Sequence, residues 1–381
     1  MSAHSKFIHR ELTSLLMERI RSNKVLLIYG TRRVGKTELA RHLASGQENP
    51  LFLNAEDERV QRLLSVQSRD RFEQLVGASS LVFLDEAQAI PEVGKRLKFL
   101  VDEFPHLTVV ATGSSSLDLN ASVGEPLTGR QVTHELFPFS MAELVAYEGR
   151  FTAESQLLNR LVFGTYPEVV LDPVGAEAYL RELADAYLMK DLLQYDGIKR
   201  SGKLMELLRL LAYQIGSEVS THELANQLQI SKDTVAKYLD LLSKVFVIFK
   251  VQGYSGNLRK EVVKSSKWYF TDNGIRNAIL RDFSPAAIRG DMGALWENFC
   301  ISERRKQLSN RREFAELHFW RTYDQQEIDL IEVRNGQIQA TEFKWNPDSA
   351  HKARMPKGFA KAYPEAGFQV IHPENVLDWL A

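Results

Sequence analysis

Short apolar runs, separated by more polar stretches, characterise the first part of the chain. Such runs stand at Val25–Tyr29, 81–84 and 107–111, and a helical pattern follows the first of them. Short apolar runs bounded by turn residues are typical of strands that are buried on both faces. The pattern therefore predicts an α/β fold for this part.

Helical periodicity dominates the middle of the chain. Residues 141–198 have a helical pattern with one turn-rich interruption, and we interpret them as a connector. The stretch 203–256 predicts three helices and a β-wing. In its third helix, Val235, Leu239 and Leu242 form an apolar stripe at i, i+4 and i+7. Capping residues mark two helix starts, at Ser220 with Glu223 and at Ser231.

The last hundred residues alternate between helix and strand patterns. Leu295 and Phe299 predict an amphipathic helix that also includes Glu297. A strand pattern follows at 317–322, then a hairpin, a helical stretch, a strand pattern at 368–373 and a final short helix.

The hairpin poses a problem of charge. Asn335-Gly336 between two β-rich runs predicts a two-residue loop, in which Arg334 faces Gln337. This register places Asp329 opposite Glu342, and Lys344 shares a face with Glu342. Like charges in facing positions destabilise a sheet. A bound cation would remove the repulsion, whereas a hairpin with a different register would separate the two acids.

Composition limits the classes of protein. A chain of 381 residues is long enough for two or three domains, and its net charge of −1 gives no overall attraction to nucleic acid. The single cysteine, Cys300, excludes an internal disulfide and suits a reducing cytosol. The N-terminal residues lack a signal-peptide pattern, and no apolar run is long enough for a membrane span. We expect a cytoplasmic protein with no membrane partner.

The stretch GTRRVGKT follows the first predicted strand and precedes the first predicted helix. It matches G-x-x-x-x-G-K-[ST], the P-loop pattern, in the strand–loop–helix context that the pattern requires. Backbone N–H groups of such a loop surround the phosphates of ATP, Lys36 reaches the β- and γ-phosphates, and Thr37 binds Mg²⁺. A glycine-rich turn without a ligand is the alternative. The predicted nucleotide-binding residues are Gly30, Thr31, Arg32, Arg33, Val34, Gly35, Lys36, Thr37 and Glu38.

Two further strand ends complete this predicted site. Asp85-Glu86 ends the second apolar run, so Asp85 would hold the Mg²⁺ water shell and Glu86 would polarise the attacking water. Thr112 and Ser114 end the third run and could contact the γ-phosphate or that water. The alternative for these two is an ordinary strand end with capping side chains.

Nine segments of the chain together resemble a known family. They are YGTRRVGKTEL, FLDEAQ, ATGSSS, LTGR, LFPFS, FGTYPEVV, SSKWYFTDNGI, ALWENF and FWRTYDQQEIDLIEVRNGQIQATEFKW. The chain resembles the bacterial and archaeal AAA-type ATPases that combine a P-loop domain with a C-terminal domain long described as of unknown function. The resemblance implies that Arg130 enters the ATP site of a neighbouring subunit, and hence a ring or other homo-oligomer. A structural arginine at the start of a strand is the alternative.

The middle stretch has the pattern of a winged helix. The third helix of such folds reads the major groove of DNA. Basic residues in and after the predicted wing could neutralise phosphates, namely Arg259, Lys260, Lys264 and Lys267. Winged helices that contact only protein, or that act as spacers, are the alternative.

The C-terminal pattern contains the parts of a PD-(D/E)xK nuclease-like fold, and the family resemblance implies the same domain. Asp329 and Glu342 would hold Mg²⁺ or Mn²⁺, and Lys344 would orient the nucleophilic water. Glu297 would lie next to these groups without binding the metal directly. A solvent-face charge pattern, or a nuclease-like relic that only binds, are the alternatives. The basic run at 304–312 favours a phosphate-rich ligand, or is the solvated end of a helix.

These inferences define an α/β protein in four parts. They are an AAA-type P-loop ATPase domain (1–145), a helical connector (146–200), an α-rich winged-helix domain (201–284) and an α/β restriction-endonuclease-like domain (285–381). We expect an ATP- and Mg²⁺-dependent oligomer that acts on DNA in repair, branch migration or defence. The alternative is a nucleotide-gated switch whose C-terminal domains only bind partners.

Overall fold

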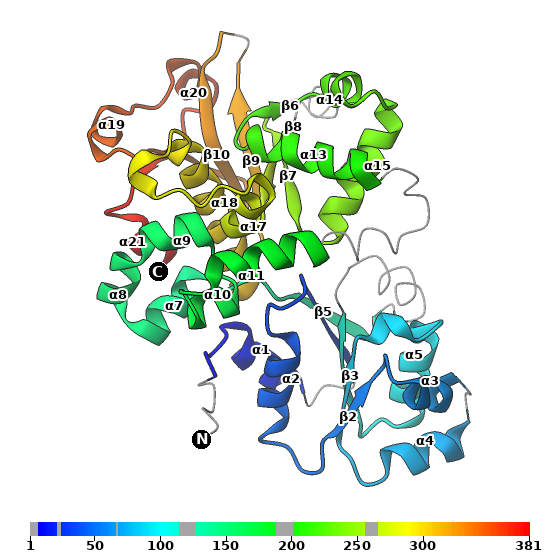
Figure 1. Cartoon of the computed structure of the whole chain (residues 1–381). Helices are drawn as coiled ribbons and strands as arrows, with labels where there is room; N and C mark the ends of the chain where they lie inside the picture. The colour runs from blue at the N-terminus through cyan, green and yellow to red at the C-terminus, as the bar shows by residue number, and fades with distance from the viewer. Residues whose placement is uncertain are drawn as a thin grey trace. The chain divides into compact units, whose positions relative to one another are not determined.

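The computed structural model describes residues 7–20, 24–65, 68–113, 127, 129–187, 201–255, 266–322 and 324–381. They form two compact units, residues 1–137 and 138–381 (Figure 1). Within the described ranges, no helix is both long and apolar enough to cross a membrane.

The first unit contains a five-stranded parallel sheet in the order β2-β3-β4-β1-β5. The strands are β1 (Val25–Tyr29), β2 (Leu51–Asn54), β3 (Leu81–Asp85), β4 (Thr108–Gly113) and β5 (Gln131–Glu135). The helical elements are α1 (Leu12–Arg19), α2 (Lys36–Ala44), α3 (Glu58–Ser65), α4 (Arg69–Val76), η1 (Ala87–Ala89) and α5 (Val93–Glu103). Every residue of β1 and β4 is buried, as the apolar runs predict.

The strand order determines which residues can meet. Because all strands are parallel, their carboxyl ends lie along one edge of the sheet. Tyr29 pairs with Gly113 there, and β4 lies between β1 and β3. The loop after β1, Asp85 at the end of β3 and Thr112 near the end of β4 therefore share this edge.

The second unit begins with helices. They are α7 (Met141–Glu148), α8 (Arg150–Ser155), α9 (Leu157–Phe163), α10 (Pro167–Leu171), α11 (Ala176–Glu182) and the π-helix η2 (Leu183–Tyr187). Ser140 and Glu143 form a capping box that starts α7. The predicted end of the ATPase domain, residue 145, thus lies inside α7 of this unit.

The stretch predicted as three helices and a wing contains these elements. They are α13 (Ser201–Tyr213), β6 (Glu218–Val219), α14 (Thr221–Leu228), α15 (Lys232–Lys244), β7 (Ile248–Gly253) and β8 (Ser266–Phe270). Ser220 accepts a hydrogen bond from the Glu223 N–H, and Ser231 from the Thr234 N–H. The stripe of α15 is buried as predicted. The predicted phosphate contacts Arg259, Lys260 and Lys264 lie outside the described residues.

The remaining elements continue the same sheet. They are α17 (Asn273–Leu280), η3 (Ala286–Ile288), α18 (Met292–Arg311), β9 (Glu316–Arg321), β10 (Glu327–Arg334), β11 (Gln337–Phe343), α19 (Pro347–Lys352), α20 (Lys357–Ala362), β12 (Gly367–Ile371) and α21 (Val376–Leu380). The seven-stranded sheet has the order β12-β11-β10-β9-β7-β8-β6, in which β7 and β9 pair in parallel. The predicted wing and the predicted nuclease-like strands therefore share one sheet, and the division of this unit into three domains stays a prediction.

Candidate functional site

The loop between β1 and α2 has the backbone that its glycines permit. Gly30 has φ 152° and Gly35 has φ 93°, in the region that favours glycine. A Cβ atom on Gly30 would lie 2.0 Å from the carbonyl oxygen of Leu136, so only glycine fits at that position. The loop therefore depends on both glycines of the predicted P-loop.

The ammonium of Lys36 lies inside this loop. Lys36 Nζ donates hydrogen bonds to the carbonyl oxygens of Gly30 (3.0 Å) and Thr31 (2.9 Å), and the side chain is buried. Phosphate oxygens could replace these carbonyls as acceptors, which suits the predicted role of the lysine.

The rest of the predicted loop set differs in orientation. Val34 is fully buried, Thr31 is buried and Arg33 is exposed with φ 61°. The Glu38 carboxylate is exposed and pairs with Arg41 at 2.6 Å, so Glu38 could contact a phosphate only through its backbone N–H.

The side chains predicted to hold Mg²⁺ are in direct contact. Thr37 Oγ1 donates a hydrogen bond of 2.8 Å to Asp85 Oδ2, and the hydroxyl of Thr112 donates to the other carboxylate oxygen. The Thr112 hydroxyl also accepts from the Glu86 N–H at 3.3 Å. The Asp85 carboxylate thereby links the start of α2 to the ends of β3 and β4. Hydroxyl and carboxylate oxygens are the ligands that Mg²⁺ prefers.

Glu86 has φ 51°, a left-handed conformation, immediately after the strand. Its carboxylate accepts a hydrogen bond from the side chain of Gln88, a residue to which the sequence interpretation gave no role. The third predicted member of this edge, Ser114, lies outside the described residues.

Arg130 lies at the amino-terminal end of the parallel strands, whereas the P-loop of its own chain lies at their carboxyl-terminal end. Its carbonyl accepts a hydrogen bond from the Val25 N–H, at the amino end of β1. Leu136, which contacts Gly30, is six residues further along the chain, a span of ~20 Å in a strand. The half-exposed Arg130 guanidinium forms an ion pair with Asp102. This position rules out a role in the ATP site of the same subunit.

The second candidate site lies on the hairpin β10–β11. Asn335 and Gly336 have φ 51° and 80°, as a two-residue loop of type I′ requires, and Arg334 pairs with Gln337. The ladder continues to Leu330 opposite Thr341, which confirms the predicted register over this length. The ladder ends there, so the pairing of Asp329 with Glu342, one step further in the same register, stays a prediction.

The two acids are held by neighbouring donors. Asp329 Oδ2 accepts a hydrogen bond of 2.8 Å from the Phe343 N–H, and Glu342 Oε2 accepts one of 2.6 Å from Lys344 Nζ. Burial, and then the charge of Asp329, raise the pKa of Glu342 to about 7, although Lys344 opposes this. The charge of Asp329 therefore disfavours ionisation of Glu342.

The prediction that Lys267 of β8 contacts phosphate is wrong. Its side chain is 1% exposed, and its Nζ lies 3.1 Å from Glu297 Oε1 and 2.6 Å from Glu327 Oε1. Tyr269 Oη donates a hydrogen bond of 2.6 Å to the same Glu297 oxygen. Lys267, Tyr269 and Glu327 are members of the acidic network that the sequence interpretation missed. The apolar neighbours of Lys267 in SKWYF were the available signal for a buried position.

The charges of this network have opposing effects on its pKa values. Burial raises the pKa of Glu297 and the charge of Asp329 raises it further, whereas Lys267 and Tyr269 lower it, and the result is about 7. Burial lowers the pKa of Lys267, but Glu297 and Glu327 more than offset this and raise it overall. The lysine is therefore charged, and Glu297 and Glu342 are the two carboxyls whose pKa is raised to about 7.

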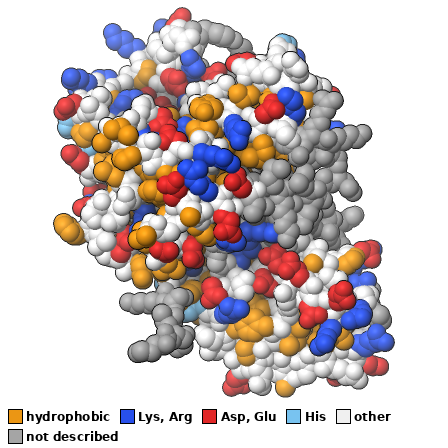
Figure 2. Space-filling model, viewed as in Figure 1, with side chains coloured by type: hydrophobic (Ala, Val, Ile, Leu, Met, Phe, Trp, Pro, Cys, Tyr) orange, Lys and Arg blue, Asp and Glu red, His pale blue; other side chains and the backbone are white. Residues whose placement is uncertain are grey.

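The basic run at 304–312 is largely engaged within the protein. Arg304 forms a bidentate salt bridge with Glu332, with N–O distances of 2.7 and 2.8 Å. Lys306 is buried, pairs with Glu303 at 2.6 Å and donates to the carbonyl of Phe139. On the face shown in Figure 2, basic and acidic side chains lie among one another over the described residues. The expectation that this run binds phosphate is therefore wrong for Arg304 and Lys306.

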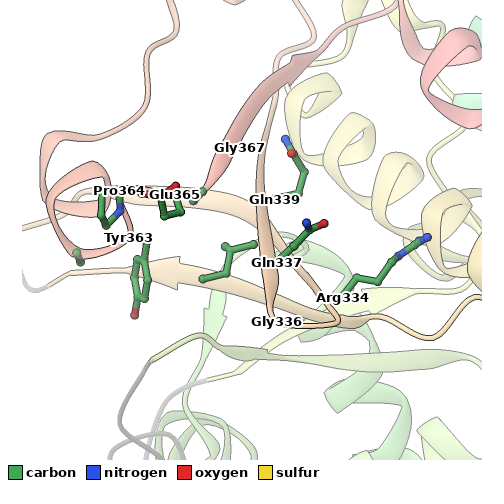
Figure 3. A pocket seen from close by; sticks show the side chains of 11 residues that line it. Arg334, Gly336, Gln337, Gln339, Tyr363, Pro364, Glu365 and Gly367 are labelled. Carbon is green, nitrogen blue, oxygen red and sulfur yellow. The ribbon is translucent and has the colours of Figure 1, made fainter.

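A hollow of about 700 Å³ lies at the other end of the hairpin (Figure 3). It is lined by Arg334 and residues 336–339 of the hairpin and by residues 362–367, which lead into β12. Asp329 is five residues from Arg334 along β10, or ~17 Å, so this hollow is separate from the carboxylates. Over the described residues, no group of three or more His, Cys, Asp or Glu side chains is arranged to hold a metal ion.

Comparisons with known proteins agree with the geometry of the first unit. Residues 22–145 match the family model of an AAA domain. Residues 154–286 and 292–378 match two models that are each described as a domain of unknown function (DUF8612 and DUF4143).

Similar proteins are found in other organisms. The chain is 27% identical over 340 residues to an uncharacterized protein of Mycobacterium tuberculosis, covering 88% of this chain and 73% of that protein. It is 25% identical over 286 residues to an uncharacterized protein of Haemophilus influenzae, covering 66% of this chain and 68% of that protein.

A solved structure that shares the fold is the Walker-type ATPase paby2304 of Pyrococcus abyssi, with a TM-score of 0.50 and 17% identity, covering 73% of this chain and 97% of that one. The match to the AAA domain and this likeness support an AAA-type P-loop ATPase domain with a parallel α/β sheet.

Proposed function

We propose that this protein is a Mg²⁺-dependent ATP hydrolase. The observation that supports this most directly is the contact between Thr37 and Asp85 beside the loop that holds Lys36. In this proposal the loop N–H groups and Lys36 bind the phosphates, and Thr37 and Asp85 hold Mg²⁺. Bound Mg²⁺ would stabilise the charge that develops on the transferred phosphoryl group.

Glu86 is proposed to orient the attacking water. The Glu86 N–H donates a hydrogen bond to the Thr112 hydroxyl, which in turn donates to Asp85. The Glu86 side chain therefore extends from a backbone position beside the proposed Mg²⁺ ligands. Gln88 contacts that carboxylate and would limit its orientation. Steady-state ATP hydrolysis with and without Mg²⁺ tests this proposal directly. A purified chain that binds no ATP in the presence of Mg²⁺ would refute it.

We propose further that the enzyme is an oligomer in which Arg130 acts on the neighbouring subunit. The support is its location at the sheet edge opposite its own P-loop. A finger contributed by another subunit stabilises charge at the γ-phosphate only in the assembled form. Light scattering with and without a non-hydrolysable ATP analogue tests the assembly step.

The second unit is proposed to combine a winged helix with a restriction-endonuclease-like domain that acts on DNA. The helices α13 to α15 with β7 and β8 support the first part. The network of Glu297, Asp329, Glu342 and Lys344 supports the second part. Two facing carboxylates fit a Mg²⁺ or Mn²⁺ ion that keeps several of its waters. Lys344 and Glu297 would then position a water and its protons.

A nucleotide-gated switch is the second candidate, and one observation favours it. Lys267, Arg304 and Lys306 are all occupied by acidic partners inside the protein, which leaves less positive charge for nucleic acid. ATP hydrolysis with no DNA, single-stranded DNA, duplex and branched DNA separates the two candidates. A DNA-driven enzyme is stimulated by one of these, whereas a switch hydrolyses slowly and is indifferent to all.

A further inference from the structure

Arg10, which precedes α1, connects the P-loop to the end of the first unit. The side chain is 4% exposed. Its Nη1 donates a hydrogen bond of 2.9 Å to the carbonyl oxygen of Val34, and its Nη2 donates one of 2.6 Å to that of Phe137. Val34 belongs to the P-loop, and Phe137 is the last residue of the first unit. A guanidinium can hold two acceptors at once because its donors form a rigid planar fork.

The bond to Val34 determines the direction of the next N–H group. In a trans peptide the carbonyl and the following N–H point to opposite sides of one plane. Because the Val34 carbonyl points toward Arg10, the Gly35 N–H points away from it. Lys36 Nζ lies within the same loop, where it donates to the carbonyl oxygens of Gly30 and Thr31. Successive N–H groups of such a loop form a concave site for anions.

The sequence around Arg10 explains why the side chain is fixed. Ile8, Leu12, Leu16 and Ile20 are buried at a spacing of four residues, and α1 packs against α2. The Thr13 N–H donates to the Arg10 carbonyl at 2.9 Å. A Cβ atom on Gly35 would lie 3.9 Å from Arg10 Nη1, so the guanidinium also lies close to the second glycine of the loop.

We propose that Arg10 is a positioning residue of the nucleotide site. It holds the Val34–Gly35 peptide so that the Gly35 N–H faces the β-phosphate of a nucleoside di- or triphosphate. The inference rests on the proposed ATPase function and adds a residue outside the P-loop motif. Because the β-phosphate is bound before and during hydrolysis, Arg10 contributes equally to both states. Its loss therefore raises KM and the Kd of ADP while kcat changes little.

The test compares Arg10→Met, Arg10→Lys and the control Arg41→Met in the full chain. Arg41 is an exposed arginine on α2, the helix that follows the loop. Binding of fluorescent ADP with Mg²⁺, steady-state ATP hydrolysis and nucleotide-free thermal melting are measured for each. We expect Arg10→Met to raise the Kd of ADP and the KM of ATP by about tenfold, the loss typical of a buried hydrogen bond from a charged donor. Arg10→Lys retains part of the affinity, and Arg41→Met matches the parental protein.

The outcomes distinguish this inference from the proposed function. A folded Arg10→Met variant with parental ADP affinity overturns the inference, even if its melting temperature falls. If Arg10→Met does not fold, a folded Arg10→Lys variant decides in the same way, since one ammonium cannot reproduce the planar fork. A parental protein that binds neither ADP nor ATP refutes the proposed ATPase function, and the positioning role falls with it.

Discussion

Thr37 donates a hydrogen bond of 2.8 Å to Asp85, although the two residues lie in separate segments of the chain. The parallel order of β1, β4 and β3 brings them to one edge, with Thr112 between them. The oxygens of this edge and the ammonium of Lys36 lie around the same loop. In the proposed function, binding and hydrolysis depend on different side chains, which mutations can separate.

Lys36→Ala should abolish ATP binding, because the β- and γ-phosphates lose their main counter-charge. Glu86→Gln should retain binding and lose hydrolysis, because only the activation of water is removed. Titration with fluorescent ATP and measurement of phosphate release distinguish the two effects. Glu92→Gln is a matched control, since Glu92 is also left-handed but pairs with Lys95 at the surface. Parental turnover by Glu86→Gln would disprove the assigned role.

Arg130→Ala should reduce ATP hydrolysis by ~10³-fold if the arginine acts on a neighbouring subunit. Mixing it with Glu86→Gln should restore part of the activity, because some boundaries then contain an intact Arg130 opposite an intact Glu86. Asp102→Asn is the comparison, since it breaks the Arg130 ion pair and keeps the arginine. If Asp102→Asn loses as much activity as Arg130→Ala, the loss comes from breaking the ion pair within the subunit and gives no support to a finger in trans. A monomer that hydrolyses ATP normally would also exclude the finger.

Sequence reasoning succeeded where local rules determine the structure. Asn335-Gly336 set the hairpin register because a two-residue loop permits one pairing. The GTRRVGKT stretch predicted a strand, a loop and a helix because glycine spacing and apolar burial act within a few residues. Both inferences needed only the nearest neighbours along the chain.

It failed where distant strands come together. The sequence pattern places Lys267 in or after a predicted DNA-contacting wing, where basic residues could neutralise phosphates. The parallel pairing of β7 with β9 places β8 in the sheet of the hairpin, and Lys267 then lies between Glu297 and Glu327. The contacts of Arg10 with Val34 and Phe137 are equally long-range. No periodicity in a single sequence reveals such pairings.

A divalent ion at Asp329 and Glu342 should raise the melting temperature by mass action, by an amount proportional to RT ln(1 + [M]/Kd). Melting of the Lys36→Ala chain in Mn²⁺ without nucleotide keeps the P-loop out of the measurement. The Asp329→Asn, Glu342→Gln double variant should lose the shift, and the exposed Glu365→Gln variant should keep it. Any DNA cleavage should vanish in the double variant and in Lys344→Ala, while ATP hydrolysis persists. Absence of a shift at millimolar Mn²⁺ would exclude the metal site.

Stability without metal should fall as the pH rises from about 5 to about 8. Glu297 and Glu342 have folded pKa values of about 7, above the ordinary 4.5, so the folded protein binds more protons than the unfolded chain between these values. Raising the pH removes those protons, and the free energy of unfolding decreases. Asp329→Asn should flatten this decrease, because the Asp329 charge raises both pKa values.

Urea unfolding at a series of pH values measures this effect, with the exposed Asp348→Asn variant as control. The control should follow the parental curve, since Asp348 lies at the start of α19 and is not among the charges that shift either pKa. Mn²⁺ should stabilise the parental protein more at the upper end of the range, because a metal ligand must be deprotonated. If Asp329→Asn loses stability with pH as steeply as the parental protein, other groups cause the dependence. The carboxylates would then not repel one another as their burial and proximity require.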